Sequence, residues 1–196
     1  MKNVIILKDI SLSFEDKTVF DSFSTEISEN TAIMGASGSG KTTLIRIITG
    51  LVKNYGGSVT FLEKPSFSAV FQEDRLFDDY SAVANVLAVA PKNLPKSEAE
   101  NKARKLLNAL LISENEMKKP VRFFSGGMKR RVAIARALFF ESDILLLDEP
   151  YKGLDEETKA RAAEVIRTFA ENRLIVLVTH DKSEAEMTGI EKVIKI

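Results

Sequence analysis

The sequence TAIMGASGSGKTTLIRIITG, residues 31–50, holds a short apolar run, a glycine-rich loop and a segment with apolar residues at helical spacing. This pattern predicts a buried strand that enters a loop, followed by a helix that stops at Gly50. The loop, GASGSGKT at residues 35–42, fits the motif G-x-x-x-x-G-K-S/T in full. Glycines let backbone N–H groups surround phosphate oxygens, and the helix N-terminus adds a partial positive charge. The stretch therefore predicts a phosphate-binding loop, in which Lys41 reaches the β- and γ-phosphates and the Thr42 hydroxyl can ligate Mg²⁺.

The composition is that of an ordinary soluble globular protein. Hydrophobic residues make up 44% of the 196 residues, charged residues make up 29%, and the formal net charge is +0. This charge gives no global electrostatic reason to expect binding to nucleic acid or to an anionic membrane. The chain has no cysteine, which argues against disulfides and thiolate chemistry. Its start resembles neither a signal peptide nor a membrane span, so we expect a cytosolic protein that something else must hold at any membrane.

The chain outside the loop predicts an α/β fold with a helical insertion. Residues 3–14 and 18–27 are rich in β-branched and aromatic residues and flank a turn-like EDK, which is typical of antiparallel strands. Residues 81–119 have a helical pattern broken by prolines, and apolar strands then alternate with helices. That alternation indicates a mostly parallel sheet covered on both faces. The further predicted elements are strands at 58–62, 67–72, 143–148, 174–179 and 191–196, and helices at about 156–171 and at 182–187.

We therefore predict a single domain over residues 1–196. Residues 1–74 and 121–196 are expected to form a RecA-like α/β core of the P-loop NTPase kind, together with an N-terminal antiparallel β-subdomain. Residues from about 75 to 120 are expected to form a helical subdomain inserted into that core.

Polar side chains follow three of the predicted strands, at the edge where open α/β sheets bind their ligands. Asp148 ends ILLLD, where its carboxylate can hold Mg²⁺ through water, and Glu149 is a candidate to polarise the attacking water. His180 follows LIVLVT and is a candidate for a γ-phosphate contact, and Gln72 ends SAVFQ and is a candidate for a contact with Mg²⁺ or water. The alternatives are a strand-end cap, a structural histidine and a surface glutamine. The phosphate loop favours functional roles for Asp148, Glu149 and His180, whereas the residues alone leave Gln72 open.

A second glycine-rich stretch, FSGGMKRR at residues 124–131, also has the composition of an anion site. It contains a hydroxyl, two glycines and a first helical turn rich in cations. The alternative is a helix N-cap with a solvated basic face, and we expect Lys129, Arg130 and Arg131 to include solvated or salt-bridged side chains. The stretch raises the question of why one small protein would carry two such sites.

These segments together resemble the nucleotide-binding domain of an ABC (ATP-binding cassette) transporter over nearly the whole chain. Residues 35–42 match the Walker A loop of that family, and LLLDEP matches its Walker B strand. FSGGM matches the signature usually written LSGGQ, and GLD at residues 153–155 falls at the D-loop. Gln72 falls at the Q-loop, His180 at the switch histidine, and Phe14 at an aromatic residue that stacks on adenine, for which a core phenylalanine is the alternative.

The resemblance assigns a role to each motif residue. It implies ATP contacts from Phe14, Gly35, Ala36, Ser37, Gly38, Ser39, Gly40, Lys41, Thr42 and Thr43, and from Ser125, Gly126, Gly127 and Met128. It implies catalytic roles for Glu149, His180, Lys41 and Gln72, and Mg²⁺ ligation by Thr42, Gln72 and Asp148.

The resemblance also implies a function and partners. Two such domains pair head to tail in this family, so that each ATP lies between the Walker A loop of one subunit and the signature of the other. We expect an ATP-hydrolysing subunit, in a homodimer or a pair of related subunits, that powers a membrane transporter from the inner face of the cell membrane. Its partners would be permease subunits and an extracytoplasmic solute-binding protein, without nucleic acid.

Import of a small solute is favoured, because RLFDDYSAVANV at residues 75–86 resembles the corresponding region of bacterial importers. The alternatives are an exporter or a lipid- or lipoprotein-handling system, a soluble ABC ATPase without a transport role, and an unrelated P-loop kinase or GTPase. The short insertion and the absence of a basic surplus disfavour the soluble ABC ATPase, and FSGGM with the Asp–Glu pair disfavours the kinase or GTPase.

Three positions depart from the family pattern. Phe124 and Met128 replace the usual leucine and glutamine of the signature, while its serine and both glycines are intact. Lys152 stands where the D-loop often has a small residue, and the sequence explains neither it nor Met128. The chain ends soon after His180, so we expect no regulation through a tail of its own. The transported substrate does not follow from this sequence.

Overall fold

Two packing units make up the chain, and the phosphate loop and FSGGM lie in different ones. The computed structural model describes residues 3–14 and 17–196. The first unit comprises the described part of residues 1–67 with Ser142–Asp148 and Asn172–Ile196, and the second comprises Ser68–Glu141 and Glu149–Glu171.

The first unit contains an antiparallel sheet built from the N-terminal strands. Strands β1 (Ile5–Phe14), β2 (Lys17–Ile27) and β4 (Gly56–Phe61) pair in the order β2-β1-β4. The predicted antiparallel strands are confirmed, since Ile5 pairs with Ile27 and Phe14 with Lys17. Two residues of the predicted turn EDK, 15 and 16, lie outside the described residues.

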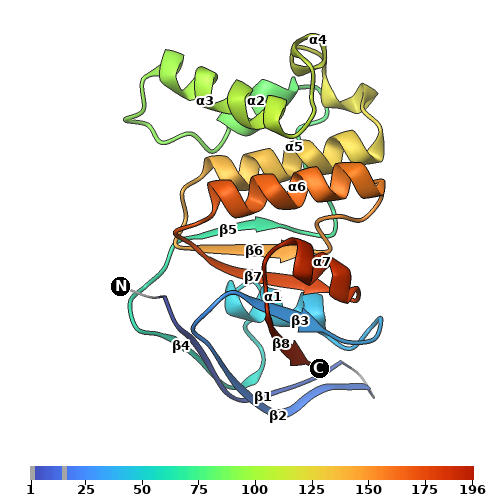
Figure 1. Ribbon diagram of the computed structural model, residues 1–196. Helices are drawn as coiled ribbons and strands as arrows, with labels where there is room; N and C mark the ends of the chain where they lie inside the picture. The colour runs from blue at the N-terminus through green and yellow to red at the C-terminus, as the bar shows by residue number, and fades with distance from the viewer. Residues whose placement is uncertain (1–2, 15–16) are drawn as a thin grey trace. The chain divides into compact units, whose positions relative to one another are not determined.

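The same unit contains a parallel sheet in which β6 (Ile144–Asp148), β7 (Leu174–Thr179), β3 (Thr31–Met34) and β8 (Lys192–Lys195) follow one another. Every residue of β6 and β7 is buried, as predicted from their sequences, which are apolar up to the last residue of each strand. Helix α1 (Lys41–Ile48) follows β3, and α7 (Lys182–Met187) follows β7. Figure 1 shows β6, β7 and β3 running side by side. Because these strands are parallel, β3, β6 and β7 end at one edge of the sheet.

The second unit is mostly helical. It contains α2 (Ala82–Leu87), α3 (Lys96–Ala109), α4 (Glu114–Met117), the 3₁₀ turn η1 (Val121–Phe123), α5 (Gly126–Phe139) and α6 (Glu156–Phe169). Strand β5 (Phe67–Val70) contains the sequence boundary between the two units, and its residues from Ser68 on belong to the second unit. Helices α2 and α3 pack on α5, and α5 runs alongside α6 (Figure 1). The prediction of an α/β fold with a parallel sheet, an antiparallel sheet and helices is confirmed.

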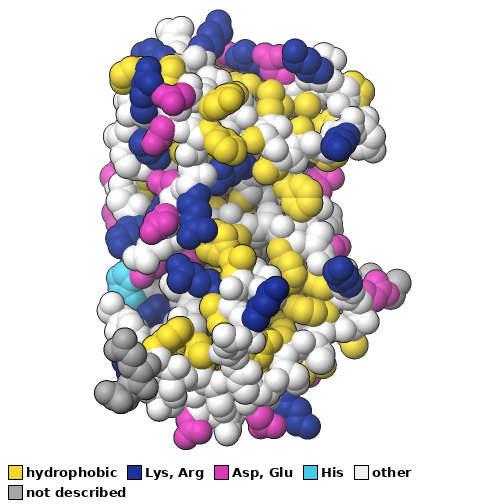
Figure 2. Space-filling model, turned by 180° about the vertical axis from the view of Figure 1, so that it is seen from behind, with side chains coloured by type: hydrophobic (Ala, Val, Ile, Leu, Met, Phe, Trp, Pro, Cys, Tyr) yellow, Lys and Arg dark blue, Asp and Glu magenta, His cyan; other side chains and the backbone are white. Residues whose placement is uncertain are grey.

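Among the described residues, no helix combines the length and the apolar character that crossing a bilayer requires. On the face seen in Figure 2, basic and acidic side chains are mixed with hydrophobic ones. That mixture agrees with the net charge of +0 and gives this face no single-sign field.

Candidate functional site

The phosphate loop connects β3 to α1, and its lysine spans it. Lys41 is the first residue of α1 and is 7% exposed. Its Nζ donates to the carbonyl oxygens of Gly35 at 2.8 Å and of Ala36 at 2.7 Å. The ammonium thus lies inside the curve of the loop, where several backbone N–H groups and the N-terminus of α1 favour an anion. The predicted phosphate-binding geometry of strand, loop and helix is present.

Thr42 and Asp148 meet beside this loop although they are far apart in the sequence. The Thr42 Oγ1 donates to Oδ2 of Asp148 at 2.7 Å, and the Asp148 side chain is almost completely buried. Thr42 lies in the first turn of α1, whereas Asp148 is the last residue of β6. A hydroxyl and a carboxylate are hard oxygen donors of the kind that Mg²⁺ prefers. The structure therefore brings two of the three predicted metal ligands together.

Gly40 shapes the start of α1. It is the N-cap residue and has φ of 101°, in the region that side chains other than glycine rarely adopt. A Cβ at this position would lie 2.5 Å from Cγ1 of Val19 and 2.9 Å from Cζ of Phe20. The glycine is therefore required twice, for its backbone conformation and for the close approach of β2.

We expect Gly40→Ala to lower the free energy of unfolding by at least about 2 kcal/mol, because it adds a clash to an unfavourable φ. Gly50→Ala is the matched control, since Gly50 has φ of 71° but no atom within 4 Å of an added Cβ. The control should cost only about 1 kcal/mol. Urea denaturation of both variants measures the difference. Equal losses would show that the contact with β2 does not constrain Gly40.

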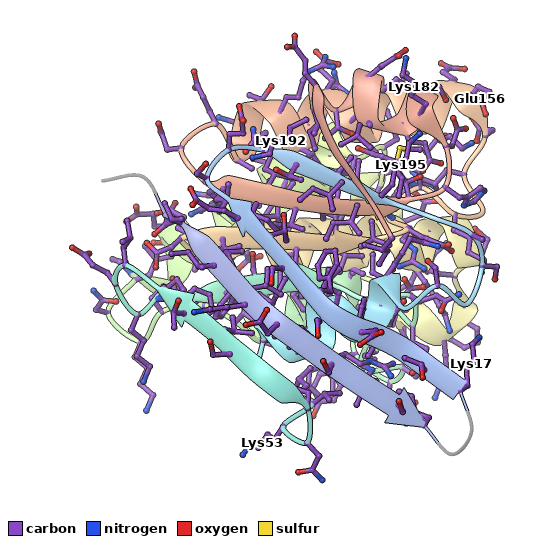
Figure 3. The ribbon with its side chains drawn as sticks, turned by 90° about the horizontal axis from the view of Figure 1, so that it is seen from below. Lys17, Lys53, Glu156, Lys182, Lys192 and Lys195 are labelled. Atoms are coloured by element: carbon purple, nitrogen blue, oxygen red, sulfur yellow. The ribbon has the colours of Figure 1, made fainter. Side chains whose placement is uncertain are left out.

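Phe14 and Lys17 lie at the ends of the paired strands β1 and β2. Phe14 is 53% exposed, so the alternative of a core phenylalanine does not hold. Lys17, labelled in Figure 3, donates from Nζ to the carbonyl oxygen of Gly38 at 3.3 Å. This bond links the antiparallel sheet to the phosphate loop, and sequence reasoning did not anticipate it.

His180 follows β7 and is exposed, next to the edge where β3 enters the phosphate loop. Thr179, the residue before it, lies in register with Met34 at the end of β3. The Thr179 hydroxyl donates to Oε2 of the buried Glu184 at 2.5 Å and accepts from the backbone N–H of Asp181 at 3.0 Å. These bonds hold both flanks of His180. Sequence reasoning missed Glu184, because a glutamate in a short helix ordinarily faces solvent.

The second unit holds a pocket of about 550 Å³ next to the N-terminus of α5. Ser125 is the N-cap of this helix, and its Oγ accepts from the backbone N–H of Met128 at 3.2 Å. Met128 thus contributes only its backbone N–H to the cap, and any residue other than proline would supply the same donor. A Cβ on Gly127 would lie 3.2 Å from the Gly153 carbonyl oxygen. The residues that line the pocket are Gln72, Asp74, Ser125, Gly126, Gly127, Arg130, Arg131, Lys152, Gly153, Leu154, Asp155 and Thr158.

Arg130 lines this pocket and holds neighbouring backbone. Arg130 is 5% exposed and donates to the carbonyl oxygens of Phe71 and Gln72, both at 2.6 Å. Its Nη1 also lies 3.1 Å from Oδ1 of Asp74. The pKa of Asp74 is raised, because the effect of burial exceeds the opposing effect of the Arg130 charge. Sequence reasoning missed Asp74, which no motif marks. Arg130 therefore fixes the backbone at Gln72 and is not a solvated cation.

Glu149 and Lys152 form an ion pair beyond the end of β6. Glu149 has φ of 48°, in the left-handed region that non-glycine residues seldom occupy and that is often found at functional positions. Its Oε2 lies 3.7 Å from Nζ of Lys152, and the two side chains are 23% and 59% exposed. The lysine that the sequence left unexplained thus neighbours the glutamate that the sequence singled out.

A model of the family described as ABC transporter matches residues 21–152. The chain is 35% identical over 190 residues to the aliphatic sulfonates import ATP-binding protein SsuB of Corynebacterium glutamicum, with 94% of this chain and 77% of that protein covered. The chain belongs to the ABC transporter family. Another ABC relative is the spermidine/putrescine import ATP-binding protein PotA of Clostridioides difficile, which is 35% identical over 199 residues. That match covers 94% of this chain and 57% of PotA.

Solved ABC cassettes have the same fold. The dimeric post-hydrolysis state of the ATP-binding cassette MJ0796, bound to ADP and Pi, superposes with a TM-score of 0.84 at 26% identity. The match covers 98% of this chain and 94% of that one. The chain is thus an ABC ATPase whose domain binds ATP.

Proposed function

We propose that this ABC ATPase is the ATP-hydrolysing subunit of a membrane importer for a small solute. The observation that carries the proposal is the meeting of Lys41, Thr42 and Asp148 at the phosphate loop. The relatives support the direction of transport, because SsuB and PotA are both named as import ATP-binding proteins. Their solutes differ, so the relatives do not identify the solute of this system.

ATP would lie on the phosphate loop, with its β- and γ-phosphates at the N-terminus of α1 and against Lys41. The exposed ring of Phe14 would stack on adenine. Thr42 and Asp148 would hold Mg²⁺ together with Gln72, and the ion would neutralise charge on the phosphates during transfer. The bond between Thr42 and Asp148 supports this, because the two oxygens already lie close together.

Glu149 would accept a proton from the attacking water, and His180 would contact the γ-phosphate. Glu149 directly follows Asp148, so the peptide bond alone keeps it beside the proposed metal ligand. His180 is flanked by Thr179 and Asp181, whose bonds set the loop that presents the imidazole.

The SGGM segment (Ser125–Met128) would bind the nucleotide held by a second subunit, a homodimeric copy or a related chain. Its pocket combines a helix N-terminus, a hydroxyl and glycine backbone, which suit phosphate. ATP would therefore join two subunits, and hydrolysis would release them. We propose that permease subunits hold this pair at the cytoplasmic face of the membrane, with an extracytoplasmic solute-binding protein as the further partner.

Ser125→Arg tests the shared site, because it places a bulky cation in the pocket without changing the phosphate loop. We expect ATP affinity of the separate subunit to stay within about twofold of the parent and ATP hydrolysis to fall at least about 100-fold, as catalytic contacts are worth roughly that much. Calorimetric ATP titration and phosphate release measure the two quantities.

Ser113→Arg is the matched control, since Ser113 is also an N-cap serine in the second unit but does not line the pocket. It should leave hydrolysis near the parent level. In the proposed model, one chain binds the nucleotide and the second chain completes its site. Loss of ATP binding by the separate Ser125→Arg subunit would contradict this model.

A further inference from the structure

Three basic residues line the pocket beside Ser125–Met128, which we call the SGGM pocket. Two of them already bind backbone carbonyl groups of this chain. Arg130 holds the carbonyl oxygens of Phe71 and Gln72. Arg131 donates to the carbonyl oxygens of Leu110 and Leu111 at 2.9 and 2.6 Å, and burial lowers its pKa. Neither guanidinium can turn to a ligand without breaking bonds that hold the backbone. Lys152 is the remaining cation.

Lys152 is held only weakly. Its side chain is 59% exposed, and its ion-pair partner in the described part of the chain is Glu149, at 3.7 Å. A pair at that separation with an exposed lysine contributes little to stability, because water screens the charge and the lysine side chain loses freedom. The ammonium can therefore exchange its partner at small cost. A phosphate group is a stronger partner, since it carries more charge than a carboxylate.

We propose that Lys152 is a phosphate-binding residue, which leaves Glu149 to contact the terminal phosphate of a nucleotide carried by the second subunit. The proposal rests on the proposed function, in which that nucleotide enters the SGGM pocket. Lysine binds phosphate as a mobile point charge and needs no fixed geometry, which suits a ligand that arrives only when two subunits close.

The test uses the full chain with Glu149→Gln, in which slow hydrolysis should preserve an ATP-bound dimer. The dimer fraction is measured by analytical ultracentrifugation against ATP concentration. Adding Lys152→Ala should raise the ATP concentration needed for half-maximal dimer by about tenfold, the loss expected for one charged hydrogen bond at each site. Adding Lys152→Arg, which keeps the charge, should recover most of the loss.

Lys129→Ala in the same background is the matched control. Lys129 is another lysine of the second unit, in α5, but it pairs with Asp78 at 3.2 Å and does not line the pocket. It should leave the ATP dependence unchanged. ATP binding by the separate subunit, measured with Ser125→Arg added, should not respond to Lys152→Ala either.

The outcomes separate the two proposals. A parent Glu149→Gln chain that stays monomeric at saturating ATP would contradict the proposed function itself. A parent that dimerises with the same ATP dependence as its Lys152→Ala derivative would overturn the role of Lys152 alone. Equal weakening by Lys152→Ala and Lys152→Arg would also overturn it, because a phosphate contact needs the charge that arginine retains. Equal weakening by Lys129→Ala would show a general charge effect instead.

Discussion

Glu149→Gln is expected to lower ATP turnover by about 10²- to 10⁴-fold, the range that a general base contributes. Glutamine has the shape of glutamate and can still contact water, but its amide cannot accept the proton that the attacking water must lose. The left-handed φ of 48° at this residue is no worse for glutamine than for glutamate, so the fold should not change. Because bound ATP should persist, the variant should accumulate as an ATP-bound dimer, which gel filtration would detect.

Glu156→Gln provides the control for this experiment. Glu156 lies in the same unit, pairs with Lys159 at 2.9 Å and is 82% exposed, so losing its charge should leave turnover unchanged. Phosphate release at saturating ATP and Mg²⁺ measures both variants. If Glu149→Gln hydrolysed ATP at the parent rate, Glu149 would have no part in activating water.

Much of the fold could be predicted because the decisive segments have unambiguous periodicity. Strands β6 and β7 are apolar up to their last residues, Asp148 and Thr179, and are buried throughout, as expected of strands covered on both faces. The prolines of the helical block mark real boundaries, since Pro95 directly precedes α3 and Pro120 directly precedes η1. Local sequence alone carries such information.

Part of the candidate site could be predicted for a different reason. Lys41, Thr42 and Asp148 follow from a motif and a strand end, and parallel strands place their carboxyl ends at one edge. The predicted roles of these residues, like those of Gln72 and His180, remain predictions. Their positions on the elements agree with the roles.

Other parts depend on tertiary contacts that no local pattern encodes. Glu184 lies in a short polar helix and accepts a hydrogen bond from Thr179. It is buried because α7 packs beside β7, a contact that the local sequence does not reveal. Lys152 could be recognised as unusual, but its neighbour Glu149 depends on the turn between them. Sequence reasoning therefore found the residues that motifs mark and missed those that position them.

Lys41→Ala is expected to weaken ATP binding by about 100-fold, since it removes a buried cation from the phosphates, and charged hydrogen bonds contribute up to about 3 kcal/mol. In the structure the ammonium holds the carbonyl oxygens of Gly35 and Ala36. The variant therefore loses both an anchor for the loop and a partner for the ligand. A titration alone would not separate these effects.

Denaturation with and without ATP separates them. Without nucleotide, the free energy of unfolding reports the anchoring role alone; with ATP, the added stability reports affinity, because a ligand that binds the folded state stabilises it by RT ln(1 + [L]/Kd). Lys17→Ala is the control, since Lys17 also donates to a loop carbonyl, that of Gly38, but from an exposed position. It should keep most of the stabilisation by ATP, whereas Lys41→Ala should lose nearly all of it. Stabilisation by ATP at the parent level in Lys41→Ala would mean that the lysine braces the loop and does not bind the phosphates.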